Sequence, residues 1–171
     1  NVDSPGVGYH LVGLPDNAIK ESSYRISAAL KNVGFKIPGK KITINMAPAD
    51  LRKEGSSYDL SIAVGILAAS NQIVAESLKE FIIMGELSLD GGLMPIKGVL
   101  PIAIKAREEG FRGIILPKQN TKEAAIVNNL EVYGVENIKE VIDFFNEGIP
   151  LERTEIDRRK EFKEKINDFP F

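Results

Sequence analysis

The stretch from Ile42 to Ser70 constrains the fold most, because it predicts a half-buried strand and a buried helix in close succession. Polar and apolar residues alternate from Lys41 to Met46, the period of two that is typical of a strand with one face on a core. Pro48 ends this strand, since proline has no N–H group to give to the ladder. The later segment LSIAVGILAA is almost entirely apolar, which indicates a helix covered on most sides.

A turn with two serines precedes this helix. Ser56, Ser57 and Asp59 are expected to accept hydrogen bonds from the unpaired N–H groups at the helix start. A hydroxyl at this position also lies near the positive end of the helix dipole. Ser57 is therefore the candidate reactive group of the chain, in either a structural or a chemical role.

The remaining elements alternate between strands and helices. Asp16 is the predicted N-cap of a helix that Gly34 terminates. An Asp-Gly turn at Asp90 predicts a hairpin that pairs FIIMGELSL with LMPI. Strands interleaved with helices from Gly113 onward predict crossover units beside an antiparallel start, and hence an α+β fold with a mixed sheet and packed helices. The other predicted strands are 7–12, 113–116 and 130–135, and the other predicted helices are 99–110, 121–127 and 137–146.

Length and charge limit the function classes. The chain of 171 residues is long enough for one domain, which we place at residues 1–149, and residues 150–171 carry the charge density of a linker or a solvated helix. With 22 basic and 24 acidic residues the net charge is −2, which disfavours nucleic-acid binding through overall charge. The absence of cysteine favours a reducing cytoplasm, and the single histidine, His10, cannot form a metal cluster alone. No apolar run approaches the ~18 residues of a membrane span.

Four strings carry a resemblance to a known family. GLPDNAIKES, NMAPADLRKEGSSYDLSIAVGILAA, MGELSLDGGLMPIKGVLPIAIKAREEGF and IILPKQN resemble the N-terminal domain of the ComM/YifB group, the magnesium-chelatase-like AAA+ proteins of bacteria. The resemblance covers about residues 5–147. It implies a fold similar to the proteolytic domain of Lon, in the class called ribosomal protein S5 domain 2-like. It also implies that the longer protein continues into an ATPase module that binds ATP and Mg²⁺ and assembles as a homo-hexameric ring. Residues 150–171 would lead to that module, and no cofactor or metal is expected in this chain.

The similarity to Lon allows a test of catalytic chemistry. Lon cleaves peptides with a Ser-Lys pair, in which a neutral lysine takes the proton of the serine hydroxyl. The Lon string Gly-Pro-Ser-Ala-Gly matches GSSYD here, so the serine is retained at Ser57 and its small neighbours are replaced by Tyr58 and Asp59. Leu100 stands at the lysine position, and Lys97, three residues earlier, is expected to stay solvated and charged. We therefore expect no peptidase activity, with a Ser57 peptidase that uses a displaced Lys97 as the alternative.

The favoured function is a non-catalytic Lon-like domain that serves a ring ATPase as a platform for assembly or for engaging substrate or DNA. The family resemblance implies DNA processing, with branch migration during uptake of transforming DNA as its best-known form. Arg52, Lys53, Lys97 and Lys118 are the candidate phosphate contacts, or else ordinary solvated charges. The string GFKIPGKK, from Gly34 to Lys41, resembles a phosphate-binding loop, but it follows a helix and precedes a strand, which disfavours nucleotide binding.

Overall fold

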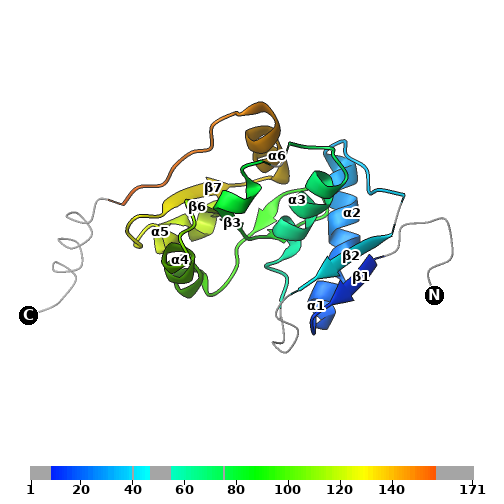
Figure 1. Cartoon of the computed structure of the whole chain (residues 1–171), viewed down its shortest axis with the longest axis horizontal. Coiled ribbons are helices and arrows are strands. Elements are labelled where there is room, and N and C mark those ends of the chain that lie inside the picture. The colour runs from blue at the N-terminus through cyan, green and yellow to red at the C-terminus, as the bar shows by residue number, and fades with distance from the viewer. Residues whose placement is uncertain (1–8, 40, 47–54, 75, 157–171) are drawn as a thin grey trace, which may run out of the picture.

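The computed structural model describes residues 9–39, 41–46, 55–74 and 76–156, which form three small sheets packed with helices (Figure 1). The α+β class predicted from the sequence is confirmed. The strands are β1 (Tyr9–Val12), β2 (Ile42–Asn45), β3 (Phe81–Ile83), β4 (Glu86–Leu87), β5 (Leu93–Met94), β6 (Gly113–Pro117) and β7 (Glu131–Val135). The helices are α1 (Asn17–Lys20), α2 (Ser22–Asn32), α3 (Asp59–Ala69), α4 (Val99–Glu108), α5 (Thr121–Ala124) and α6 (Ile138–Glu147), with 3-10 turns η1 (Leu78–Glu80) and η2 (Lys118–Asn120).

The largest sheet is parallel throughout, in the order β3-β6-β7. Its central strand, β6, is buried at every residue, because helices cover both faces of the sheet. Ile115 faces a first core cluster, which is formed with α2, α3 and α6, whereas Ile114 and Leu116 face a second core cluster with α4 and α5. This alternation follows from the period of two along a strand. The predicted crossover connections are confirmed, since α4 lies between β3 and β6 and α5 lies between β6 and β7.

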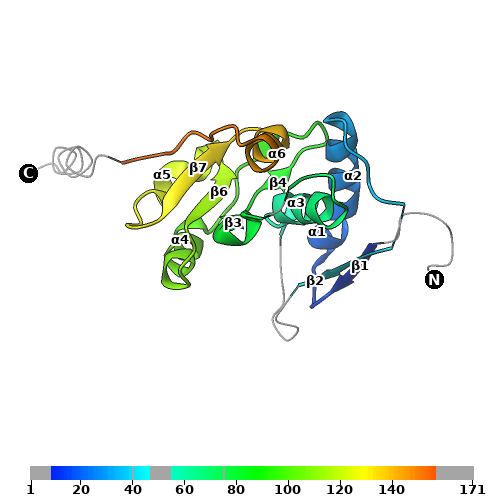
Figure 2. The same ribbon diagram turned by 45° about the horizontal axis from the view of Figure 1, so that its top comes forward.

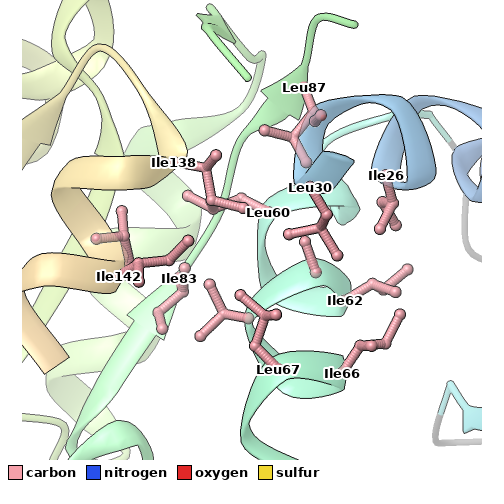
Figure 3. Close-up of a cluster of buried hydrophobic side chains, with 14 of the residues drawn as sticks. Ile26, Leu30, Leu60, Ile62, Ile66, Leu67, Ile83, Leu87, Ile138 and Ile142 are labelled. Atoms are coloured by element: carbon pink, nitrogen blue, oxygen red, sulfur yellow. The ribbon is translucent and has the colours of Figure 1, made fainter. Parts of the chain in front are cut away.

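α3 supplies more buried residues to the first core cluster than any other element (Figure 3). Leu60, Ala63 and Leu67 are fully buried, while Gly65 and Ala69 are exposed, so the prediction of a helix covered on most sides is confirmed. Ile62 and Ile66 extend from the side of α3 opposite Leu60 (Figure 3). Neither α3 nor any other helix among the described residues has the length and apolar character needed to cross a membrane.

The antiparallel start predicted for the sheet is only partly correct. β1 and β2 are parallel, because α1 and α2 carry the chain back between the end of one strand and the start of the next. The hairpin at Asp90 exists, but only Glu86–Leu87 and Leu93–Met94 pair across it. Phe81–Ile83 pairs with β6 instead, where both faces of the strand are covered.

The ends of the helices follow the local sequence signals closely. Asp16 caps α1 by accepting a hydrogen bond of 2.9 Å from the backbone N–H of Ile19, and Gly34 adopts a φ of +86° after α2. The single helix predicted between them is interrupted at Glu21. At the other end of the chain, Thr154 N–H donates to the Val132 carbonyl at 2.8 Å, so the segment predicted as a linker from residue 150 begins with residues that contact β7.

Candidate functional site

The candidate site is the loop Gly55–Tyr58, which leads into α3. Its backbone is fastened to the connection between β3 and β4 by two hydrogen bonds in opposite directions. Gly85 N–H donates to the Ser57 carbonyl at 2.9 Å, and Leu60 N–H donates to the Gly85 carbonyl at 3.0 Å. A side chain at Gly85 would lie 3.1 Å from Leu93 Cδ2, so glycine permits the close approach that these bonds require. The position of the Ser57 backbone is thereby fixed.

Polar side chains hold the loop on its other sides. Asp16, the cap of α1, accepts a second hydrogen bond of 2.7 Å from the Gly55 N–H through its other carboxylate oxygen. The Ser56 hydroxyl donates a short hydrogen bond to the Glu86 carboxylate on β4. The loop is therefore joined to both the N-terminal helices and the hairpin.

A buried ion pair lies at the first residue of α3. Arg25 Nε donates to Asp59 Oδ2 at 2.7 Å, and Arg25 Nη2 donates to Asp59 Oδ1 at 2.9 Å. The Asp59 side chain has no solvent exposure, and that of Arg25 is 19% exposed. Asp59 Oδ2 also accepts from the Leu87 N–H at 3.1 Å, and Arg25 Nη2 also donates to the Ala18 carbonyl at 2.7 Å. The pair therefore links α1, α2, α3 and β4 at one point.

Burial and pairing act in opposite directions on this carboxylate. Burial raises the pKa of Asp59, and the hydrogen bonds from Arg25 and from the Leu87 N–H oppose that rise. The pKa of Arg25 is raised by its hydrogen bond to Asp59, which favours the charged guanidinium. The negative charge expected beside Ser57 is therefore compensated by Arg25 within 3 Å, rather than left free to repel a developing oxyanion.

The capping role predicted for the serines and Asp59 is wrong. α3 begins after Tyr58 without a side-chain cap, and the Asp59 N–H bonds the backbone carbonyl of Ser56 at 3.2 Å. Ser56 instead donates to Glu86, and Asp59 instead accepts from Arg25 and Leu87. These side chains bond to distant partners because a hydrogen bond to a charged or buried group is stronger than one to an exposed N–H group at a helix end.

Among the described residues, no basic side chain forms a hydrogen bond with the Ser57 hydroxyl. The Ser57 side chain is half-buried, and among the described residues no lysine donates to or accepts from it. Lys97 is exposed in the turn before α4 and forms no ion pair within the described part of the chain. Lys97 therefore lacks the hydrogen bond to the Ser57 hydroxyl that a general base would need.

Leu100, which the resemblance to Lon predicts at the position of the catalytic lysine, occupies the first turn of α4. Its side chain is half-buried and packs against the second core cluster, while its N–H donates to Glu123 Oε1 at 3.3 Å. Tyr58 packs against both core clusters, so its ring contributes to the apolar packing on either side of the loop. Leu100 and Tyr58 therefore both contribute to the packing of the second core cluster.

The structure describes only two of the four residues predicted to contact phosphate. Arg52 and Lys53 lie outside the described residues. Lys118 is exposed and pairs with Glu136 at 3.3 Å, so it would have to leave this carboxylate to contact a phosphate. The buried amide of Asn120 holds the chain beside Lys97 close to η2, because it accepts from Ile96 N–H at 2.9 Å and donates to the Ile96 carbonyl at 2.8 Å. The tertiary structure thereby places the segments that carry Lys97 and Lys118 next to each other.

Sequence reasoning missed the polar groups that organise the site. Arg25 and Asn120 are 34 and 24 residues away from their respective partners, and no local pattern connects such distant positions. Their signal in the sequence is weak: Arg25 follows two serines and a tyrosine, and Asn120 lies in the polar stretch KQNTKE, so neither stands out from its neighbours. No group of three acidic or histidine side chains that could hold a metal ion is present in the described ranges.

Comparison with known proteins confirms the family resemblance. A family model described as subunit ChlI of Mg-chelatase matches residues 1–120. The competence protein ComM of Haemophilus influenzae is 47% identical over 146 residues, which are 84% of this chain and 28% of that protein. The YifB protein of Escherichia coli is 42% identical over 146 residues, which are 85% of this chain and 29% of that protein.

A weaker similarity reaches the Lon proteases. Lon protease 2 of Bacillus subtilis is 29% identical over 126 residues, which are 72% of this chain and 22% of that protein. This similarity supports a Lon-like domain fold. The chain spans less than a third of the length of each of these relatives.

Proposed function

The chain belongs to the family of subunit ChlI of Mg-chelatase, and we propose that it is a non-catalytic, Lon-like N-terminal domain of a longer Mg-chelatase-like AAA+ ATPase. In that protein it would act as a platform for assembly or for engaging substrate or DNA. The matched region is only 28% of ComM and 29% of YifB, which leaves room for an ATPase module in proteins of this kind. ATP, Mg²⁺ and the contacts of a hexameric ring belong to that module in this proposal, and the cytoplasmic location stays a prediction.

The replacement of a base by Leu100 carries the non-catalytic part of the proposal. An aliphatic side chain cannot accept the proton of the Ser57 hydroxyl, and the exposed Lys97 has no contact with that hydroxyl within the described residues. Losing the base of such a pair lowers the rate by about 10⁴-fold or more. The Ser57 loop is then best explained as a rigid connection between α1, α3 and the β4–β5 hairpin.

Turnover of a labelled casein and labelling by a fluorophosphonate test this part. We expect no cleavage above background and no labelling of Ser57 by the fluorophosphonate, which reacts with activated serines. A Lon protease assayed in parallel is the positive control. Casein turnover that disappears in a Ser57→Ala variant, while the variant keeps the unfolding midpoint of the wild type, would overturn the non-catalytic assignment and favour the Ser57–Lys97 alternative.

The role in DNA processing is supported by the name of ComM, a competence protein, and by the adjacency of the segments that carry Lys97 and Lys118. Fluorescence anisotropy with a labelled duplex at increasing salt tests direct contact. We expect the double variants Lys97→Ala/Lys118→Ala and Arg52→Ala/Lys53→Ala to weaken binding and to reduce the salt slope by about one per lost contact. Absence of binding at low salt, or unchanged slopes in both variants, would reject direct DNA contact by this domain.

A Lys105→Ala variant is the matched control for these substitutions. Lys105 is exposed on α4 and pairs with Glu109 at 2.9 Å. Its replacement by alanine removes one positive charge, as does each substitution of a candidate residue. An equal effect of Lys105→Ala would show that overall charge, rather than the candidate residues, determines the binding.

A further inference from the structure

A groove runs along β2, between this strand and α3. Its larger part has a volume of about 590 Å³ and is lined by the five consecutive residues from Ile42 to Met46 and by one side of α3. A second part of about 450 Å³ continues past Lys41 to Asn71. The two parts share Ile66 and Ala69 on the helix, so they form one channel beside the strand. Figures 1 and 2 place the β1–β2 pair at the end of the molecule opposite α4 and α5.

The groove lies along the edge of β2 with which no strand of the described ranges pairs. Successive side chains of a strand point to opposite faces, so a cavity lined by five residues in a row lies along the edge of the strand rather than on one face. β1 occupies the other edge and contributes no residue to the lining. Met46 N–H donates to the Val12 carbonyl of β1 at 2.6 Å. Because backbone groups alternate in direction along a strand, Thr43 and Asn45 direct their N–H and C=O groups into the groove.

These backbone groups of Thr43 and Asn45 have no hydrogen-bond partner within the part of the chain that the structure describes. An edge with free N–H and C=O groups at the strand repeat is complementary to another extended backbone. A small rigid ligand does not reproduce that spacing. The hydrogen-bonding groups along the groove therefore favour an extended polypeptide over a small molecule.

The helix side of the groove leaves room for such a backbone. Ser61, Gly65 and Ala69 recur at every fourth position of α3, and all three line the groove. A Cβ at Gly65 would meet no atom within 4 Å, so the space beside it is open. The single charged residue of the lining is Lys41, which is exposed and forms no ion pair among the described residues.

We propose that this groove binds an extended peptide segment of a partner protein, which adds a strand to the free edge of β2. Apolar side chains at alternate positions of the peptide would pack against Ile62 and Ile66 of α3, and an acidic residue would lie near Lys41. One cationic group is too few for binding of a nucleic-acid backbone. The inference goes beyond the proposed function and does not depend on it, because it requires neither DNA nor an ATPase module.

Fluorescence anisotropy with the full 171-residue chain and a labelled, terminally blocked peptide Asp-Val-Thr-Val-Thr-Val tests this proposal. We expect saturable binding, and loss of binding when alternate peptide nitrogens are methylated to remove their donors. Gly65→Leu fills the groove from the helix side and should weaken binding at least about tenfold, while helix propensity keeps the unfolding midpoint at or above that of the wild type. Lys122→Leu adds the same side chain at an exposed position of α5 and should leave binding unchanged.

A second variant removes one edge donor. Thr43→Pro deletes the N–H group that faces the groove and leaves the ladder to β1 intact, since proline is tolerated at strand edges. We expect binding to weaken about tenfold. The proposal is overturned if the wild type does not bind the peptide, or if Gly65→Leu and Thr43→Pro bind it as the wild type does. It is also overturned if light scattering shows a dimer that Gly65→Leu dissociates, because the occupant is then a second copy of the chain.

Discussion

The ion pair between Arg25 and Asp59 should contribute more to stability than any other polar contact described here. Removing one partner of a buried charge pair costs about 3–5 kcal/mol, because the other charge stays buried without compensation. Asp59→Ala should lie near the lower limit, at about 3 kcal/mol, since Arg25 is 19% exposed and keeps its bond to the Ala18 carbonyl. Arg25→Ala should cost about 4 kcal/mol, because it leaves a fully buried carboxylate with the Leu87 N–H as its remaining partner among the described residues.

A double-mutant cycle measures the interaction itself. The two single costs amount to about 7 kcal/mol, but the double variant should lose only about 5 kcal/mol, because neither charge is then left unpaired. The coupling energy should therefore be about 2 kcal/mol. Urea unfolding followed by far-ultraviolet circular dichroism gives the four free energies of unfolding. A coupling energy below about 0.5 kcal/mol would refute the view that these two side chains form one stabilising unit.

The pH dependence of the same pair has a defined sign. The pKa of Asp59 is raised in the folded state by burial, so the folded protein holds this proton more tightly than the unfolded chain does. The extra stability that comes from this tighter proton binding is therefore fully present below the unfolded pKa of Asp59 and is lost as the pH rises through its folded pKa, whereas the hydrogen bonds of Asp59 with Arg25 and the Leu87 N–H contribute separately. Asp59→Asn has no such titration, so it should lower the free energy of unfolding more in acid than at neutral pH. The opposite trend would mean that Arg25 outweighs burial.

Three further substitutions test how the structure around the site is held. Asn120→Ala removes both hydrogen bonds to the Ile96 backbone from a buried position and should cost about 2–3 kcal/mol in urea unfolding; a loss below about 1 kcal/mol would contradict the role of this amide. Asn137→Ala removes the N-cap of α6, whose side chain accepts from the Lys139 N–H at 2.8 Å, and should lower stability by about 1 kcal/mol, whereas Asn137→Ser should restore most of it. Gly134→Ala places a methyl group 2.5 Å from Thr121 Cγ2 and should lower the thermal midpoint, with a cost of about 1–3 kcal/mol; an unchanged midpoint would show that η2 moves freely.

Local signals in the sequence predicted most of the elements correctly. Asp16 caps a helix and Gly34 ends one, because a short side chain and a glycine satisfy helix ends through contacts within a few residues. The apolar run of β6 likewise predicted a buried strand, and all of its residues are buried. A strand covered on both faces has few polar residues, so it can be identified from its own sequence. Pairing partners were less predictable: an antiparallel start was expected before Gly113, but β1 and β2 in that region are parallel. A two-residue periodicity identifies a strand but does not specify its neighbour.

For the candidate site, the sequence predicted which group is missing, namely a lysine base for Ser57. Leu100 and the exposed Lys97 were recognised from the match to Lon, and the structure places the Leu100 side chain against the second core cluster. The roles of Ser56 and Asp59 were wrongly predicted, because their partners Glu86 and Arg25 lie 30 and 34 residues away. Local rules assign a polar side chain to the nearest helix end, and a buried partner from another element offers a stronger bond.

The sequence by itself determined most of the helices, most of the strands and the family, and it predicted Leu100 at the position of the Lon base. These properties depend on residue type and on spacing within one segment. Only the tertiary structure decided that Arg25 neutralises Asp59 and that Asn120 brings the segments of Lys97 and Lys118 together. It also decided that no strand in the described part of the chain covers the edge of β2 beside α3. The physical reason is that hydrogen bonds and burial depend on distances in space, and chain folding sets those distances between residues that no local pattern connects.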